Sequence, residues 1–336
     1  MRRVAIALFA LLAGWPVAAS GDPVEDFYRG KKLDMIIGYS PGGTYDLYAR
    51  LVARYLGNYL PGKPLIIPRN MPGAGSRAAA NWVFNVAPRD GTVLATADQS
   101  LSLQQAVGEK GINFDTTKFI YIGNPNIENN TTATWYKSGV KTIDDARRRE
   151  VTMGATGGST SSQYPKAMNA LLGTRFKVVL GYQGGNDINL AMERGEVDGR
   201  GSNSWTSWKT TRPDWVAEKK INILVQIGLA KAPDLPDVPL LMDLGANDAD
   251  RALLRLLSAS TNVGRPIFTT PDVPAERVAA LRKAFDAMVA DPAFVAQARK
   301  EKFDIDPLSG EGVQKVVSDI VATPKAQGER LGKIIE

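Results

Sequence analysis

The sequence lacks cysteine and histidine throughout its 336 residues. Without cysteine there are no disulfides, no thiolate nucleophiles and no cysteine metal ligands. Without histidine the chain lacks the commonest general base and the commonest zinc ligand, so a Ser-His-Asp triad is excluded. Serine–lysine pairs and carboxylate pairs remain open, so enzyme chemistry is constrained rather than excluded.

A strong charge of one sign is also missing. The formal net charge is +6, and it falls to about +4 if Arg2 and Arg3 are removed with a leader segment. The densest basic run, Arg147–Arg149, follows two aspartates at the end of a predicted helix and is interpreted as a solvated helix end. We therefore expect no nucleic-acid partner.

Nucleotide and calcium motifs are incomplete. The pattern G-x-x-x-x-G-K-[ST] does not occur, and Gly73-Ala74-Gly75 lacks the third glycine of a dinucleotide fingerprint. Asp304-Ile305-Asp306 lacks the remaining ligands of a calcium loop. No cofactor and no metal are expected.

The N-terminal stretch "MRRVAIALFALLAGWPVAAS" has the three parts of a secretory signal peptide: two arginines, an apolar run and small residues. We predict that residues 1–20 are a signal peptide cleaved after Ala19 or Ser20, and that the mature protein is periplasmic. A membrane anchor is the alternative, but the apolar run of about 12 residues is short for a span. No later apolar stretch approaches 18 residues.

Apolar and β-branched runs alternate with segments of helical spacing along the chain. This alternation predicts an α/β fold with parallel strands and crossover helices. The predicted strands are 33–39, 65–68, 92–98, 119–125, 133–138, 150–156, 176–182, 221–228 and 303–308. The predicted C-terminal helices are 274–290, one that restarts at Asp291-Pro292, and 312–332.

Glycine-rich turns stand between strand and helix at residues 40–43, 72–76, 157–162 and 183–187. A helix N-terminus carries free N–H groups and positive partial charge, and glycine lets a ligand approach the backbone. Such turns gather beyond the carboxyl ends of the strands, where ligands of open α/β sheets bind. Any single turn could be only a tight connection, but their recurrence favours a site for a small anion.

Several segments together resemble the tripartite tricarboxylate transporter substrate-binding receptors, also called the Bug family. They are "YSPGGTYDLYARLVARYL", "NMPGAGSRAAANWV", "GATGGSTSSQYPKAMNALLG", "KVVLGYQGGNDINLAMERGEVDG", "LPDVPLLMDLG" and "PDVPAERVAALRKAFDAMVADPAF", in collinear order over nearly all of the mature chain. The resemblance implies a periplasmic receptor with a type II binding-protein-like fold, in which two lobes of mostly parallel sheets flanked by helices enclose a ligand cleft. It also implies a carboxylate ligand and delivery to the subunits of a membrane transporter.

The resemblance implies that Tyr39–Gly43 with Asp46, and Tyr182–Asp187, hold a ligand carboxylate partly through water, and that Gly157–Ser162 holds the other end. The full predicted ligand-binding set is Tyr39, Ser40, Pro41, Gly42, Gly43, Asp46, Gly75, Ser76, Gly158, Ser159, Thr160, Ser161, Tyr182, Gln183, Gly184, Gly185, Asp187 and Asn203.

Several of these residues have an alternative structural role. The serines and threonines could be helix caps, and Asp46 and Asp187 could simply favour a helix start. Arg69 and Arg77 could pair with a carboxylate or be surface arginines. The family often has histidine where this chain has Tyr164, and the Trp205/Trp208 region is unusually aromatic; both could reshape the pocket.

We expect a monomer with residues 21–125 and 259–336 in one discontinuous lobe, residues 126–258 in the other, and hinges near 125 and 259. The expected function is a solute-binding receptor rather than an enzyme. Two alternatives remain open. One is a ligand sensor for a membrane kinase. The other is an exported hydrolase with a nucleophile among Ser159–Ser162, whose nearest lysine is Lys166.

Overall fold

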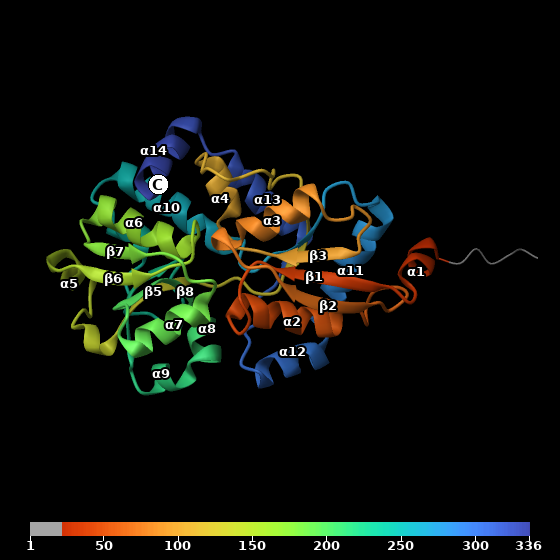
Figure 1. Ribbon diagram of the computed structural model, residues 1–336, viewed down its shortest axis with the longest axis horizontal. Coiled ribbons are helices and arrows are strands. Elements are labelled where there is room, and N and C mark those ends of the chain that lie inside the picture. The colour runs from red at the N-terminus through yellow and green to blue at the C-terminus, as the bar shows by residue number, and fades with distance from the viewer. Residues whose placement is uncertain (1–21) are drawn as a thin grey trace, which may run out of the picture.

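The computed structural model describes residues 22–336, so the predicted signal peptide lies outside the described residues. Figure 1 shows two lobes side by side, each a sheet with helices on both faces. The strands are β1 (Lys32–Ile37), β2 (Leu65–Asn70), β3 (Val93–Thr96), β4 (Ile120–Asn124), β5 (Asn130–Trp135), β6 (Val151–Gly154), β7 (Phe176–Val179), β8 (Gly199–Ser204), β9 (Ile221–Ile227), β10 (Ile267–Thr269) and β11 (Leu308–Ser309).

The helices complete the two lobes. They are α1 (Pro23–Tyr28), α2 (Thr44–Leu56), α3 (Arg77–Asn85), α4 (Leu101–Ala106), α5 (Ile143–Arg148), α6 (Thr160–Leu172), α7 (Gly185–Arg194), α8 (Trp205–Thr211), α9 (Pro213–Ala217), α10 (Asp248–Ala259), α11 (Ala275–Ala290), α12 (Pro292–Lys300), α13 (Gly310–Val321) and α14 (Lys325–Ile335), with 3₁₀ turns η1 (Ala74–Ser76), η2 (Tyr136–Ser138), η3 (Leu241–Leu244) and η4 (Ser260–Asn262). No helix within residues 22–336 is both long and apolar enough to span a bilayer.

The two sheets share one pattern of strands. The first has the order β11-β4-β10-β3-β1-β2 and the second the order β7-β6-β8-β5-β9. In each, three neighbouring strands are parallel (β2-β1-β3 and β7-β6-β8), and an antiparallel strand (β10 or β5) separates them from a further strand. The predicted two-lobe α/β fold is confirmed, but each sheet is mixed rather than mostly parallel.

The chain crosses between the sheets twice. It leaves the first sheet at Asn124 and enters the second at Asn130. It returns through α10 and η4 and re-enters the first sheet at Ile267. Strands β10 and β11 and the helices α11 to α13 therefore lie with the first sheet, whereas α14 packs against α6 of the second lobe.

The sheet cores follow from the alternation of apolar residues along the strands. In β1, Leu33, Met35 and Ile37 pack with the apolar face of α2, while Ile36 points to the opposite face and packs with α3. Successive side chains of a strand point to opposite faces, so one apolar run supplies both layers. Helices consequently cover both faces of this sheet (Figure 1).

The structure has two strands, β8 and β10, that the apolar runs did not predict. The strand predicted at residues 303–308 is shorter and lies at Leu308–Ser309. Strand β8 reads Gly-Arg-Gly-Ser-Asn-Ser, which carries no apolar pattern. It is a strand because it lies between β6 and β5. A Cβ at Gly201 would overlap the backbone of Ser161 and the ring of Pro165, so glycine is what allows α6 to lie close to this sheet.

Candidate ligand-binding site

A cavity lies between the lobes, where the carboxyl ends of β1, β3, β6 and β8 meet. Its water-accessible volume is about 60 Å³, the space of a few water molecules. The first lobe and the returning crossing contribute Tyr39, Gly42, Gly43, Thr44, Tyr45, Asp98, Gln99 and Arg265; the second lobe contributes Asn130, Thr156, Ser159, Thr160, Ser161, Gly185, Asn186, Ile188, Asn189, Arg200, Ser202, Asn203, Ser204, Ser207 and Thr211. Most of these residues offer hydrogen-bond donors or acceptors.

Two helices begin at this cavity with no side-chain cap. Helix α2 follows Gly43 and helix α7 follows Gly184, and neither glycine can supply a capping oxygen. A Cβ built at Gly43 would lie 3.8 Å from the backbone nitrogen of Gly185, so the two N-termini face each other across the cleft. Free N–H groups and two positive helix ends therefore converge on one small space, an arrangement that favours an anion.

Helix α6 begins at the same cavity but is capped by its own side chains. Ser159 and Ser162 form a reciprocal capping box, and the Ser161 hydroxyl accepts a hydrogen bond from the Thr156 N–H at 3.0 Å. The Ser159 hydroxyl is 2.7 Å from that of Thr156 and 2.8 Å from that of Ser161. Ser159, Thr160 and Ser161 line the cavity, but the two serine hydroxyls are already bonded to their neighbours.

These serines have no basic partner for nucleophilic chemistry in the part of the chain that the structure describes. Lys166 instead donates to the carbonyl oxygens of Ile335 (3.1 Å) and Glu336 at the end of α14. The same described residues hold no group of three or more carboxylates that could bind a metal ion. The serine hydroxyls are therefore held by capping bonds and have no basic activator among the described residues.

Two charged groups at the cavity have their partners within the protein. The buried Asp98 carboxylate accepts from the Tyr39 hydroxyl (2.5 Å) and from the N–H (2.9 Å) and hydroxyl (2.5 Å) of Ser100. Burial raises the pKa of Asp98, although these hydrogen bonds oppose the shift. Arg265 forms an ion pair with Glu128 and donates to Ser204. Although burial acts to lower it, the Glu128 carboxylate keeps the pKa of Arg265 above its usual value.

Arg200 is one of the charged cavity residues that sequence reasoning missed, together with Asp98 and Arg265. It lies on β8, and its Nη1 donates to the Gly185 carbonyl (3.2 Å) and to Oδ1 of Asn189 (3.1 Å). Its guanidinium lies 5.8 Å from the ring centre of Trp208. Burial lowers the pKa of Arg200 to about 9. The one available signal was a single charged residue between two glycines, in a stretch otherwise made of serine and asparagine.

The predicted ligand-binding residues divide into those that line the cavity and those that do not. Tyr39, Gly42, Gly43, Ser159, Thr160, Ser161, Gly185 and Asn203 line it. Asp46 instead accepts hydrogen bonds from the Gly42 N–H (2.9 Å), Arg50 (2.9 Å) and Asn70 (2.8 Å), so it shapes the loop before α2. Burial acts to raise the pKa of Asp46, but these bonds hold it below its usual 3.8.

Other predicted residues lie around the cavity. The Ser40 hydroxyl donates to Asp187 of the second lobe at 3.1 Å, and Gly184 lies against Ser40. Gly75, Tyr182 and Gln183 line a separate cavity of about 160 Å³ that shares Tyr39 and Thr156 with the main one.

The remaining predicted residues are further from the cavity. Pro41 is exposed on the outer side of its loop, and buried Ser76 donates to the Gly38 carbonyl at 3.1 Å. Gly158 lies against Arg77, which pairs with Glu109 at 2.6 Å. Arg69 pairs with Asp34 at 2.6 Å on the surface. Neither Arg69 nor Arg77 lines the main cavity.

The aromatic residues singled out from the sequence lie behind the cavity wall. The buried Tyr164 hydroxyl meets Gln99 (3.4 Å) and Asn130 (3.3 Å), both of which line the cavity. Trp208 is buried beneath Arg200 and bonds to Thr131 at 2.9 Å. Trp205 points away and donates to Asp234 at 3.0 Å. These residues support the wall rather than form it.

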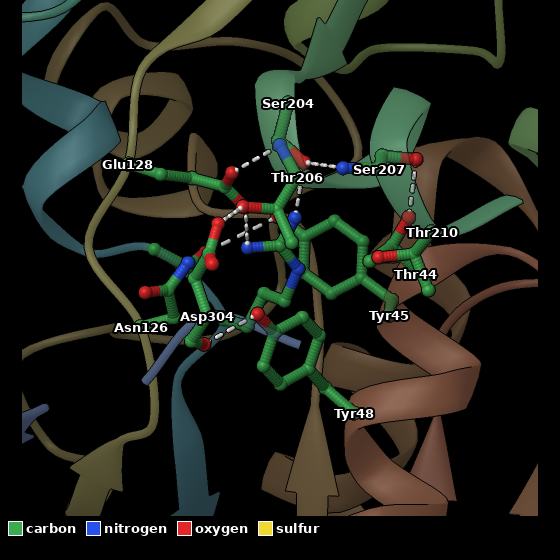
Figure 2. A network of polar contacts seen from close by, with 12 residues as sticks. Thr44, Tyr45, Tyr48, Asn126, Glu128, Ser204, Thr206, Ser207, Thr210 and Asp304 are labelled. Carbon is green, nitrogen blue, oxygen red and sulfur yellow. Dashed lines mark hydrogen bonds and ion pairs between the residues drawn. The ribbon is translucent and has the colours of Figure 1, made fainter. Parts of the chain in front are cut away.

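A polar network joins the lobes beside the cavity (Figure 2). Asp304, which follows α12, accepts from the Thr206 hydroxyl (2.6 Å) and from Lys209 (2.9 Å) on α8 of the second lobe. Glu128, on the outgoing crossing, accepts from the Thr206 N–H at 2.7 Å. Thr44 at the start of α2 bonds to Ser207 of α8. The structure is thus a closed arrangement of the two lobes.

Comparison with known proteins relates the fold to periplasmic binding proteins. No protein-family model matches the sequence, and no curated protein matches it. Three solved structures are similar over 91% of this chain: the periplasmic binding protein BugD (TM-score 0.72, 19% identity, 98% of that chain), MatC from Rhodopseudomonas palustris with bound malate (0.71, 18%, 99%) and an R. palustris protein with adipate (0.70, 18%, 97%). At these identities the comparison establishes the fold alone, which this chain shares with these three proteins over nearly their full length.

Proposed function

We propose that this chain is an exported solute-binding receptor of the tripartite tricarboxylate transporter type, which captures a small organic anion, in particular a carboxylate. The observation that carries the proposal is the interlobe cavity, at which the uncapped N-termini of α2 and α7 face each other. A bound carboxylate would accept hydrogen bonds from both lobes and neutralise both helix ends.

The proposed mechanism is hinged closure around the ligand. We assign residues 21–125 and 259–336 to one lobe, residues 126–258 to the other, and the hinge to the two crossings near 125 and 259; on this assignment α14 contacts α4 of its own lobe and reaches across to α6 of the other. Because both lobes line the cavity, a ligand there contacts more of the protein in the closed state than in the open state. That difference in affinity is what shifts the population toward closure.

The chemistry of the cavity favours a carboxylate over an amino acid. Asp98 could have bound a ligand ammonium group, but its oxygens already accept from Tyr39 and Ser100. Two of the structurally similar proteins hold the dicarboxylates malate and adipate. Periplasmic location and delivery to a membrane transporter rest on the N-terminal pattern and the family resemblance; a sensor role would be distinguished by the neighbouring genes.

The proposal is tested by a thermal-shift screen of the purified mature protein with pyruvate, malate, adipate, citrate and benzoate, followed by calorimetry. The diamides of malate and adipate serve as neutral controls. At least one acid is expected to raise the midpoint of unfolding, to bind one-to-one and to leave a monomer on gel filtration. Binding of none of the five acids, or equal binding of acid and diamide, would contradict the proposal.

A further inference from the structure

The charged groups near the cavity differ in whether the protein supplies a counter-charge. Arg265 is paired with Glu128, Asp46 with Arg50, and Asp98 has donors around it. Arg200 takes part in none of the ion pairs formed among residues 22–336. It is therefore a cavity charge with no ion-pair partner among the described residues, although the Asp187 carboxylate lies near enough to act on it.

The donor groups of Arg200 are also incompletely used. Nη1 has two acceptors, the Gly185 carbonyl and Asn189. The enclosed Nε has no hydrogen-bond partner among the described residues. Nη2 lies against the Cα of Gly185, where a Cβ would overlap it. Glycine at position 185 is thus what lets the guanidinium reach the first turn of α7.

At the N-terminus of α7, Arg200 has one nearby carboxylate, that of Asp187 in the first turn, which raises the pKa of Arg200 but itself accepts a hydrogen bond from Ser40. Cations are favourable near the C-terminus of a helix, and anions near its N-terminus. Here a guanidinium lies at the N-terminus of α7, and the N-terminus of α2 faces the same space. Desolvation lowers the pKa of the half-buried Arg200, and the nearby Arg212 adds to this effect while Asp187 opposes it.

We propose that Arg200 is the residue that recognises ligand charge, and that its guanidinium pairs with a carboxylate of the bound anion at the N-terminus of α7. This inference rests on the proposed function, because it assigns a contact within the same site. Arginine presents parallel N–H groups that match the two oxygens of a carboxylate. A neutral ligand of the same shape would leave the guanidinium without an ion-pair partner, so the site would discriminate against it.

The test compares Arg200→Gln with Arg212→Gln by calorimetry. Arg212 is a matched control because its Nη2 bonds to Asn186 of the same α7 turn at 2.8 Å but the residue does not line the cavity. The probes are the tightest-binding acid of the five named above and the amide made from one of its carboxylates. We expect Arg200→Gln to weaken binding of the acid about ten- to a hundredfold and Arg212→Gln to change it less than about threefold.

The amide probe separates charge pairing from a purely structural role of Arg200. If Arg200 pairs with a carboxylate, the preference of the wild type for acid over amide shrinks in Arg200→Gln. Unchanged affinity in a folded Arg200→Gln, or equal losses in both variants, overturns the assignment while leaving the proposed function intact. If none of the five acids binds the wild type, the proposed function itself fails, and the assignment with it. Arg200→Met, which removes the charge and keeps an unbranched side chain, replaces the glutamine variant if that does not fold, and an unchanged affinity would equally overturn the assignment.

Discussion

Replacing Gly43 with valine tests whether the glycine turn before α2 is more than a connection. The backbone of Gly43 has φ −82° and ψ 166°, an extended conformation that valine adopts without strain. A Cβ at this position would have one neighbour within 4 Å, the Gly185 nitrogen at 3.8 Å. The valine methyl groups extend beyond the Cβ and would therefore enter the space between the two helix N-termini.

The structure predicts opposite effects on affinity and stability. A ligand carboxylate or a bridging water excluded from this space loses at least one hydrogen bond to a charged group, worth about 1.5–3 kcal/mol. That loss corresponds to about a tenfold to hundredfold weaker affinity. Stability should not fall, because a residue with a side chain restricts the unfolded chain more than glycine does, an effect of about 0.4–1 kcal/mol in favour of folding.

The assay combines calorimetry with the tightest-binding acid of the screen and thermal unfolding followed by circular dichroism. Gly43→Ala is the graded control, because a single methyl group projects less far and should weaken binding less than valine does. A folded Gly43→Val protein with wild-type affinity would show that this turn only connects strand and helix and takes no part in ligand binding. A large loss of stability would show instead that the cavity is tighter at this position than the structure indicates.

Three further changes test the surroundings of the site. Glu128→Gln leaves Arg265 buried without its partner, so denaturant unfolding should reveal a loss of about 3–5 kcal/mol; a loss below about 1 kcal/mol would contradict a buried ion pair. Asp304→Asn weakens the contacts that join the first lobe to α8 of the second. The ligand-free protein should then open more often, so small-angle X-ray scattering should give a larger radius of gyration. An unchanged radius would contradict a role of Asp304 in holding the lobes together. The pKa of Asp46 in the folded protein lies below the value of 3.8 expected in the unfolded chain, so the charged carboxylate stabilises the fold above pH 3.8 and this stabilisation is lost as pH falls through the folded pKa. Asp46→Asn should therefore make the free energy of unfolding fall less steeply with decreasing pH below 3.8. An equally steep fall in the variant would refute the contribution of Asp46.

Many of the strands and helices could be predicted from the sequence because the local spacing of apolar residues and glycines determines where they form. Strand β1 is mostly apolar and interrupted only by Asp34 between Leu33 and Met35–Ile37, and α2 repeats apolar residues at helical spacing after a glycine turn. The glycine turns predicted the place of the cavity for the same reason: a parallel strand, its turn and its helix put the turn at one edge of the sheet.

The rest depends on contacts distant in sequence. Strand β8 has no strand-forming pattern of its own and is held between β6 and β5. Arg200 belongs to the cavity because β8 brings it beside the first turn of α7, and no local spacing reports that proximity. Conversely, Ser159 and Ser161 line the cavity as predicted, but their hydroxyls are used for capping, which the sequence left as an alternative.

The polar contacts between the lobes fall into two kinds, which bear differently on opening. Glu128 lies on the outgoing crossing and Arg265 on the returning one, so their ion pair joins the two hinge segments and can persist while the lobes rotate. The contacts of Asp304 with α8 and of Ser40 with Asp187 join lobe to lobe and must break on opening. The exposed Lys209–Asp304 ion pair contributes little, about 0–1 kcal/mol. The Ser40–Asp187 and Thr206–Asp304 hydrogen bonds are partly buried, the Thr44–Ser207 bond is buried, and α14 packs against α6. A bound anion bridging the N-termini of α2 and α7 adds contacts that exist only when the lobes are together, and we infer that it thereby shifts the equilibrium toward closure.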